Sequence, residues 1–228
     1  MEMENLLGRL YRQRFSVREM TQKNEIWKVL CRSYFQKYIS KDSSVLDLGA
    51  GFGEFINNIR CSEKCAVDIN EDGRDYLNPE VKFYKRAASD LSFLGEASID
   101  FVFISNVAEH LKTREDVIKA FEEIARVLRP EGRVMVMGPN VRYLSKIYWD
   151  FFDHYIPVSH KAVVELLQAL GFKVEIALGK FLPFTTKSRI PKWPIAVNAY
   201  LRFPPIWRIM GRQMLVLAQK PKVPVKWR

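Results

Sequence analysis

Short apolar runs alternate with helical patterns along most of the chain, and this alternation constrains the fold more than any other feature of the sequence. The helical patterns carry apolar residues at three- and four-residue spacings, whereas the runs between them have the length and composition of buried strands. Strands separated by helices pair in parallel through right-handed crossovers. We therefore expect an open α/β sheet with helices on both faces. The strands are predicted at 44–48, 65–69, 81–84, 99–105, 133–138, 172–178 and 213–219, and the helices at 24–39, 54–60, 117–128 (capped at Thr113) and 161–170.

The composition indicates a globular chain without a membrane span. Of the 228 residues, 48% are hydrophobic and 13% aromatic, which is enough for one domain with a substantial core. No run reaches the roughly 18 to 20 apolar residues that a span needs, and the N-terminus lacks the basic and then apolar pattern of a signal peptide. We expect a cytoplasmic protein, either soluble or peripheral at the inner membrane face.

The three cysteines, Cys31, Cys61 and Cys65, are too few and too irregularly spaced for a disulfide framework. No further pair of Cys or His residues completes a zinc-like set. From this pattern we expect reduced cysteines and no metal site.

A glycine loop follows the first predicted strand in the stretch VLDLGAGFGEF, residues 45–55. A P-loop needs Lys and then Ser or Thr after its last glycine, but Phe55 and Ile56 follow here. A dinucleotide-binding loop needs a third glycine where this chain has Glu54. The loop therefore suits a ligand whose contacting part carries no phosphate, although a tight turn without any ligand is the alternative.

An acid ends the second predicted strand. Asp68 lies 21 residues after Asp47, where a carboxylate can accept both hydroxyls of a ribose. The alternative for Asp68 is an N-cap of the residues that follow. Taken with the glycine loop, the acid favours an adenosine without a diphosphate.

With these motifs the sequence resembles the class I S-adenosylmethionine-dependent methyltransferases, of the small-molecule and glycan type (methyltransferase type 11-like). The resemblance implies a Rossmann-like seven-stranded sheet, an N-terminal helical lid over residues 1–40, and a methyltransferase domain over residues 41–228 with an insertion at about 180–212 between the last two strands. It also implies S-adenosyl-L-methionine as cofactor. The matching segments are VLDLGAGFGEF, AVDIN, IDFVFISNVAEHL and VLRPEGRVMVMGPN.

The resemblance further implies a set of cofactor-binding residues. The glycine-loop backbone contacts the methionine part, an acid beneath it reaches the ammonium, and the end of the fourth strand offers a carbonyl. The sequence departs from the family pattern at the adenine site. Arg86 and Ala87 stand where the family often has Gly-Asp, whose Asp accepts from the adenine amino group. Backbone groups near Ala87 and Ala88, with Ser89 or Asp90, would bind adenine instead. Arg14 and Tyr11 share a helix face that belongs to the lid or is simply solvated. The full set is Asp47, Gly49, Ala50, Gly51, Asp68, Ile69, Ala87, Ala88, Ser105, Asn106, Tyr11 and Arg14.

Two histidines are candidate catalytic bases for an oxygen acceptor. His110 follows the fourth strand, and His154 lies in the aromatic segment WDFFDHY beside Asp150 and Asp153, which could orient it. A cap or scaffold role is the alternative for His110, and a structural role is expected for His160. The segment SNVAEH lacks the pattern typical of base-nitrogen methylation, but carboxylate and amine acceptors remain open.

The net charge of +10 belongs to the C-terminal segment, because residues 176–228 hold 11 Lys or Arg and no Asp or Glu. The aromatic and basic insertion at 180–212 suits an anionic membrane or lipid-linked substrate, packing against the protein or a homodimer partner, or RNA. The favoured function is O-methylation of a small molecule or glycan, including a lipid-linked saccharide in glycan biosynthesis. The alternatives are an RNA methyltransferase and a non-catalytic binding protein with this fold.

Overall fold

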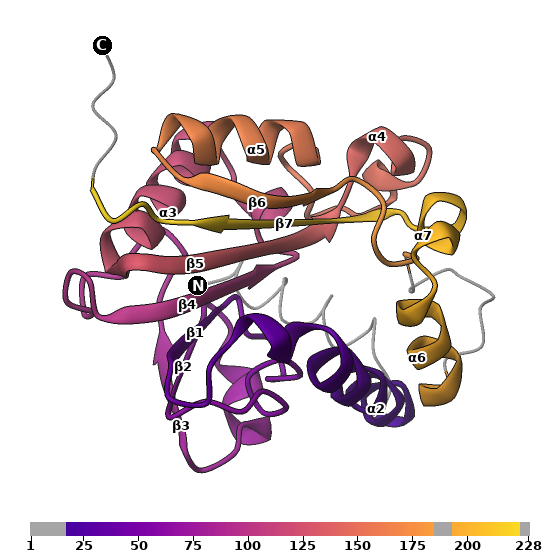
Figure 1. The fold of residues 1–228 in the computed structure, drawn as a ribbon, viewed down its shortest axis with the longest axis horizontal. Coiled ribbons are helices and arrows are strands. Elements are labelled where there is room, and N and C mark those ends of the chain that lie inside the picture. The colour runs from indigo at the N-terminus through magenta and orange to yellow at the C-terminus, as the bar shows by residue number, and fades with distance from the viewer. Residues whose placement is uncertain (1–16, 185–192, 224–228) are drawn as a thin grey trace.

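A seven-stranded sheet forms the centre of the computed structural model, which describes residues 17–184 and 193–223 (Figure 1). The strand order is β3-β2-β1-β4-β5-β7-β6, in which neighbours are parallel from β3 to β5 and β7 is antiparallel to both of its neighbours. This order confirms the predicted α/β sheet. The strands are β1 (Ser44–Leu48), β2 (Glu63–Asp68), β3 (Val81–Lys85), β4 (Ile99–Ser105), β5 (Leu128–Pro139), β6 (Lys173–Leu178) and β7 (Gln213–Gln219).

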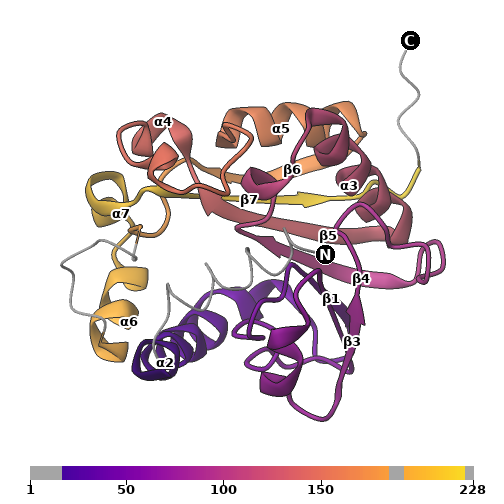
Figure 2. The same cartoon turned by 180° about the vertical axis from the view of Figure 1, so that it is seen from behind.

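Helices cover both faces of the sheet, as the alternation predicts (Figures 1 and 2). Apolar residues of α3 (Arg114–Val127) and α5 (His160–Ala169) pack on one face. On the other face lie α2 (Val17–Ser33), η1 (Phe35–Tyr38), α6 (Pro194–Arg202) and α7 (Pro204–Met210). The short elements η2 (Glu71–Tyr76), η3 (Ala108–His110), α4 (Val141–Leu144) and η4 (Tyr148–Asp150) follow the carboxyl ends of strands.

The predicted helix at 54–60 is wrong, because these residues form consecutive turns. The Asn58 side-chain amide donates to the Glu54 carbonyl at 2.8 Å, which takes the acceptor that the Asn58 backbone N–H would use in an α-helix. That N–H donates instead to the Phe55 carbonyl at 3.0 Å. A local side-chain bond thus outcompetes the helical pattern of the apolar residues.

Helix boundaries elsewhere follow their caps. The predicted helix at 24–39 is divided into α2, which begins earlier, and the 3-10 turn η1. Thr113 and Asp116 form the expected capping box of α3, with each side chain accepting from the other's backbone N–H. Ser159 caps α5, so His160 is the first residue of that helix, one residue before the predicted range 161–170.

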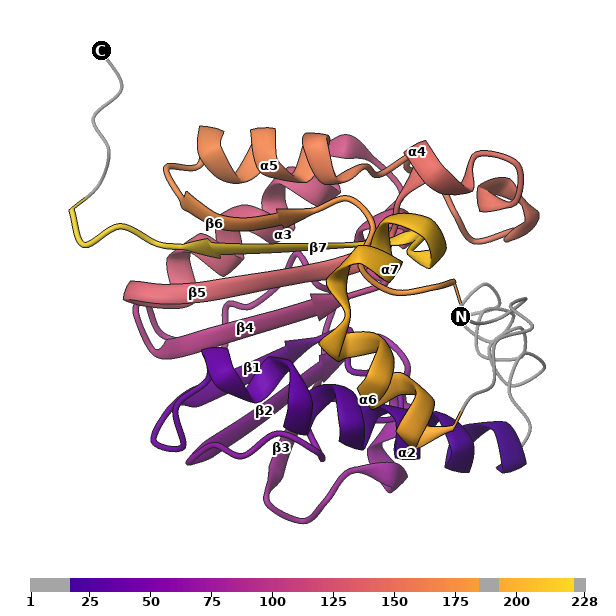
Figure 3. The same ribbon diagram turned by 45° about the vertical axis from the view of Figure 1, so that its right-hand side comes forward.

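The described part of the insertion between β6 and β7 contains two short helices that begin with prolines, of which α6 lies beside α2 and α7 packs on α6 (Figure 3). Its inward side is buried, with Leu201 and Trp207 in the same core as α2. The Trp207 indole donates to the Tyr200 carbonyl at 2.8 Å, and the Tyr200 hydroxyl donates to the Phe181 carbonyl at 2.6 Å. Of the three roles predicted for the insertion, packing against the protein therefore applies to its inward side.

No helix within residues 17–184 and 193–223 is both long and apolar enough to cross a membrane.

Candidate functional site

The glycine loop lies at the carboxyl ends of β1 and β2, where parallel sheets bind ligands. The backbone N–H groups of Gly49 and Ala50 both donate to the Val67 carbonyl, which ties the loop to β2. Gly49 has a φ of +77°, and a Cβ there would overlap the Val107 side chain. Only glycine fits this position, and the contact places the loop directly against the segment that follows β4.

Asp47 is buried beneath the loop, with 3% of its surface exposed. Its Oδ2 atom has no hydrogen-bond partner among the described residues. Burial raises the pKa of Asp47 well above its usual range, and the negative charge of Glu54 raises it further. An orphaned carboxylate oxygen at this depth fits the ammonium group of the expected cofactor, which would supply the missing partner.

Asp68 binds the glycine loop directly. Its Oδ2 accepts from the Gly51 N–H and its Oδ1 from the Asn70 N–H, both at 2.8 Å. Burial raises the pKa of Asp68, although the Asn70 and Gly51 hydrogen bonds oppose the rise. Each oxygen keeps a second lone pair, which suits a ribose diol. The alternative role as an N-cap is wrong, because Asn70 caps η2.

The remaining predicted cofactor residues lie around the same edge of the sheet. Ile69 is exposed directly after β2, and Ala88 is buried whereas Ala87 is exposed after β3. The Asp90 carboxylate accepts from the backbone and the hydroxyl of Ser92, so it is already engaged there. Ser105 and Asn106 end β4, and Asn106 has a positive φ of 53°. Tyr11 and Arg14 lie outside the described residues.

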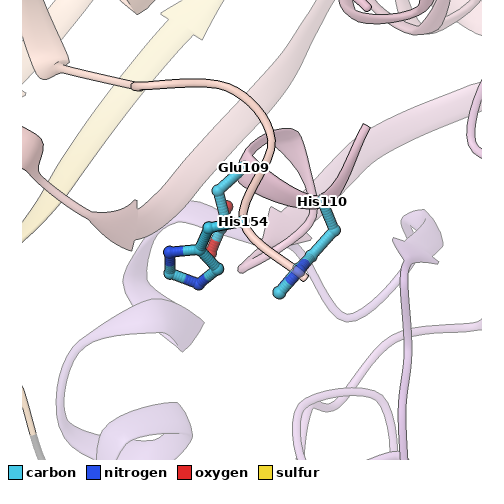
Figure 4. Close-up of side chains that lie close together, drawn as sticks. All are labelled: Glu109, His110 and His154. Carbon is cyan, nitrogen blue, oxygen red and sulfur yellow. The ribbon is translucent and has the colours of Figure 1, made fainter. Parts of the chain in front are cut away.

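Both candidate bases come together with a carboxylate that the sequence analysis missed. The loop after η4 is bound to Glu109, whose carbonyl accepts from the Tyr155 N–H at 2.8 Å and the Ile156 N–H at 3.3 Å. His110 and His154 consequently lie with ring centroids 5.0 Å apart. Figure 4 shows the two rings and the Glu109 carboxylate facing one space. Glu109 could have been identified from the sequence, because it is an acid within the largely apolar segment that follows β4.

Aromatic rings connect His154 to a basic pocket. Phe151 stacks on the His154 ring with centroids 5.0 Å apart, and Phe184 contacts Phe151 edge to face at 5.6 Å. Phe184 also lines a pocket of about 580 Å³. Among the described residues, the pocket walls contain three cations, Arg142, Lys146 and Arg212, and no acid, together with apolar groups. A fourth cation, Lys180, lies over the ring of Tyr143, which belongs to the wall.

His160 lies away from this cluster. Its Nδ1 is 2.8 Å from the Asn140 side-chain amide, and burial lowers the pKa of His160, as do the positive charges of Arg142 and Lys161. The same Asn140 amide donates to the Gly179 carbonyl, so the contact joins the start of α5 to the end of β6. The expected structural role of His160 agrees with these contacts.

Known proteins are similar to part of this chain. Residues 46–136 match the family described as methyltransferase domain. The Methanocaldococcus jannaschii protein MJ0638 is 32% identical over 137 residues, covering 59% of this chain and 56% of the relative. The mouse protein named Probable tRNA methyltransferase 9B is 27% identical over 101 residues, covering 41% of this chain and 21% of that protein. The matches thus span about half of the first relative and about a fifth of the second.

Solved structures match over more of the chain and show the fold. A SAM dependent methyltransferase from Archaeoglobus fulgidus superposes with a TM-score of 0.64 at 23% identity, covering 86% of this chain and 94% of that one. A chain of the Haloferax volcanii complex between the Trm112 methyltransferase activator and a methyltransferase superposes with a TM-score of 0.65 at 18% identity, covering 90% and 94%.

Proposed function

We propose that this chain, which carries a class I S-adenosylmethionine-dependent methyltransferase domain, transfers a methyl group from S-adenosyl-L-methionine to an oxygen of a small molecule or glycan. The family match and the fold indicate the cofactor. The proposed acceptor class rests on one observation: Glu109, His110 and His154 come together beside a basic pocket.

The protein's task in this reaction is to position two groups. Bound S-adenosyl-L-methionine supplies a methyl group on a sulfonium, and transfer leaves the carbon–sulfur electron pair on sulfur while the acceptor oxygen gains the methyl group and loses a proton. Asp47 and Asp68 hold the cofactor side. Beside His110 and His154, a hydroxyl acceptor would lose its proton. The contact between Gly49 and Val107 brings the two sides together.

The basic pocket favours an acceptor that carries an anionic group. Arg142, Lys146 and Arg212 line it without any acid, so a phosphate or carboxylate can be bound there by several charge-assisted hydrogen bonds. The aromatic contact from Phe184 through Phe151 to His154 links the wall of the pocket to the catalytic cluster. A phosphate-bearing saccharide on a lipid carrier meets both requirements, because its phosphate fits the pocket and its sugar hydroxyls can reach the histidines.

The outer side of the insertion supports contact with a membrane that holds such a lipid. Trp193, Ile195 and Ile209 are 68%, 84% and 73% exposed, respectively. The cations Arg202 and Arg208 lie on the same two helices, and no acid does. Exposed apolar side chains among cations are typical of proteins that bind the headgroup region of anionic membranes.

Labelled cofactor identifies the acceptor class. We would incubate the protein with methyl-labelled S-adenosyl-L-methionine and an extract of the source cells, and then separate lipids, water-soluble small molecules and RNA. We expect label in the lipid or small-molecule fraction and none with Asp68→Ala. Lys146→Ala should reduce labelling of anionic products, whereas Lys119→Ala, on the exposed side of α3, should not. Label in RNA that ribonuclease releases, or no label in any fraction, would overturn the proposal.

Vesicle flotation tests the membrane contact separately. The triple variant Trp193→Ser, Ile195→Ser and Ile209→Ser should stop floating with vesicles that contain anionic phosphatidylglycerol. Ile118→Ser, which removes an exposed apolar residue from the opposite face, is the matched control and should float like the wild type. If the triple variant floats unchanged, the insertion is not the membrane-binding surface.

A further inference from the structure

We propose that Glu109, His110 and His154 form a binding site for one divalent transition-metal ion, which would activate the acceptor hydroxyl. The role in activation rests on the proposed methyl transfer, but ion binding itself does not. The site lies between η3 and the loop after η4, on the acceptor side of the glycine loop (Figure 4).

The three residues have the spacing of a site that closes around an ion. One ligand atom from each lies within 4.8 Å of the other two. Metal–ligand bonds of about 2.1 Å separate neighbouring ligand atoms by about 3 Å, so an approach of roughly an ångström or two completes the site. Rotation of the three side chains can supply this approach without backbone movement.

Hydrogen bonding leaves the correct nitrogen of His110 free to bind a metal. Its Nδ1 lies 2.7 Å from the Asp153 carbonyl oxygen. A carbonyl only accepts, so Nδ1 carries the proton and Nε2 keeps its lone pair. The Asp153 carboxylate lies 3.5 Å from the same Nδ1 and strengthens this arrangement. Metal-binding histidines commonly donate their other N–H to a carbonyl or carboxylate in this way, which fixes the ring.

Glu109 is a buried carboxylate that needs a positive partner. Only 2% of its surface is exposed, so a charged carboxylate at this position loses most of its hydration. The carboxylate lies near Gly138, where an added Cβ would come within 3.6 Å of Oε2. Buried carboxylates are stable when they are paired or bind a metal. An ion shared with the two imidazoles satisfies that need.

The donor set indicates the class of ion. Two imidazoles and one carboxylate suit Zn²⁺, Fe²⁺, Mn²⁺ or Co²⁺ and leave coordination positions open. Mg²⁺ and Ca²⁺ prefer sites made only of oxygen ligands. The open positions would face an acceptor. The sequence pattern predicted no metal site because the ligands do not form a local motif. His110 and His154 are 44 residues apart, and they meet only because β4 and β5 pair in the sheet.

A bound ion would change how the acceptor loses its proton. A hydroxyl oxygen that coordinates the ion has a lowered pKa and releases its proton to water. The oxygen lone pair then forms the new bond to the methyl carbon as the carbon–sulfur bond breaks. Both imidazoles hold the ion through nitrogen lone pairs, so neither has to act as the base.

Manganese binding to the full chain tests the site. Mn²⁺ alone is titrated into chelator-treated protein, and free Mn²⁺ is measured by electron paramagnetic resonance. Manganese binds thiolates poorly, so the three cysteines do not compete. We expect one ion per chain in the wild type. Glu109→Gln, which keeps the shape of the side chain, and His110→Asn, which keeps a donor for the Asp153 carbonyl, should each weaken binding by at least about tenfold.

His160→Gln is the matched control, because it removes the third and last histidine of the chain outside the cluster. It should bind Mn²⁺ like the wild type. If the wild type binds no Mn²⁺ but still transfers methyl groups, the metal site is wrong and the histidines act as bases. If ion binding is unchanged in both cluster variants, the ion lies elsewhere and the inference is overturned. One ion per chain without any methyl transfer would leave the site in place and sink the proposed function instead.

Discussion

The cofactor side and the acceptor side of this protein are built in different ways. The cofactor side, at the ends of β1 and β2, is local: Asp47, the glycine loop and Asp68 lie within 22 residues and are bound to one another through backbone groups. The acceptor side assembles from three distant segments, which are η3, the loop after η4 and the insertion. The family match over residues 46–136 contains the first and the η3 part of the second, and it ends before the loop after η4 and the insertion.

The two sides differ in how strongly backbone geometry restricts their sequences. A loop that holds the cofactor through backbone atoms needs glycines at fixed positions, so its sequence is restricted. An acceptor site made of side chains on loops after β4 and β5 can change without disturbing the sheet. We propose that the aromatic and basic insertion takes part in acceptor choice, while its inward side holds it to the sheet.

The largest expected effect concerns the anchoring of the insertion. Trp207→Ala removes a buried ring that contacts Tyr34 and Phe181, so we expect the free energy of unfolding to fall by about 3 to 5 kcal/mol. Trp193→Ala, at an exposed position, should change it by less than about 0.5 kcal/mol. Urea denaturation measures both. Equal small losses would mean that the insertion is not part of the core.

A somewhat smaller loss is expected on the cofactor side. Gly49→Ala places a Cβ at positive φ and against the Val107 side chain, which should cost about 2 to 4 kcal/mol of unfolding free energy and remove cofactor binding. Gly95→Ala has open space around the added Cβ and serves as the control. Denaturation curves that coincide for the two variants would contradict the close approach of the loop and the segment after β4.

A gain in stability is expected at Asp47, whose buried carboxylate destabilises the cofactor-free protein. Asp47→Asn removes a buried carboxylate whose Oδ2 has no partner, and should stabilise the free protein by roughly 1 to 3 kcal/mol near neutral pH. Because the pKa of Asp47 is raised in the folded chain, the folded state holds its proton above the ordinary pKa of 3.8, and the wild type loses stability as the pH rises from there.

The advantage of Asp47→Asn over the wild type should therefore grow as the pH rises above 3.8. Urea unfolding at several pH values measures it, with Asp75→Asn, at an exposed acid of η2, as the control variant. A constant difference would mean that Asp47 does not titrate abnormally.

The sequence was sufficient for the sheet and for the placement of the glycine loop with its two acids, because both depend on local patterns. All seven strands follow from apolar runs, and Asp47 and Asp68 follow from strand ends. It was insufficient at Asn58, whose side chain competes with a helix, and at Glu109, whose partners are 44 and more residues away. His110 and His154 were identified one by one, but their meeting depends on the register between β4 and β5.

Calorimetric titration with S-adenosyl-L-homocysteine, the demethylated cofactor, tests the separation of the two sides most directly. We expect the wild type and Glu109→Gln to bind it with dissociation constants within about twofold of each other, because Glu109 belongs to the acceptor side. Asp68→Ala should bind at least about 100-fold more weakly, since it loses charge-assisted hydrogen bonds to the ribose. Unchanged binding by Asp68→Ala, or its loss in Glu109→Gln, would contradict the division of the site.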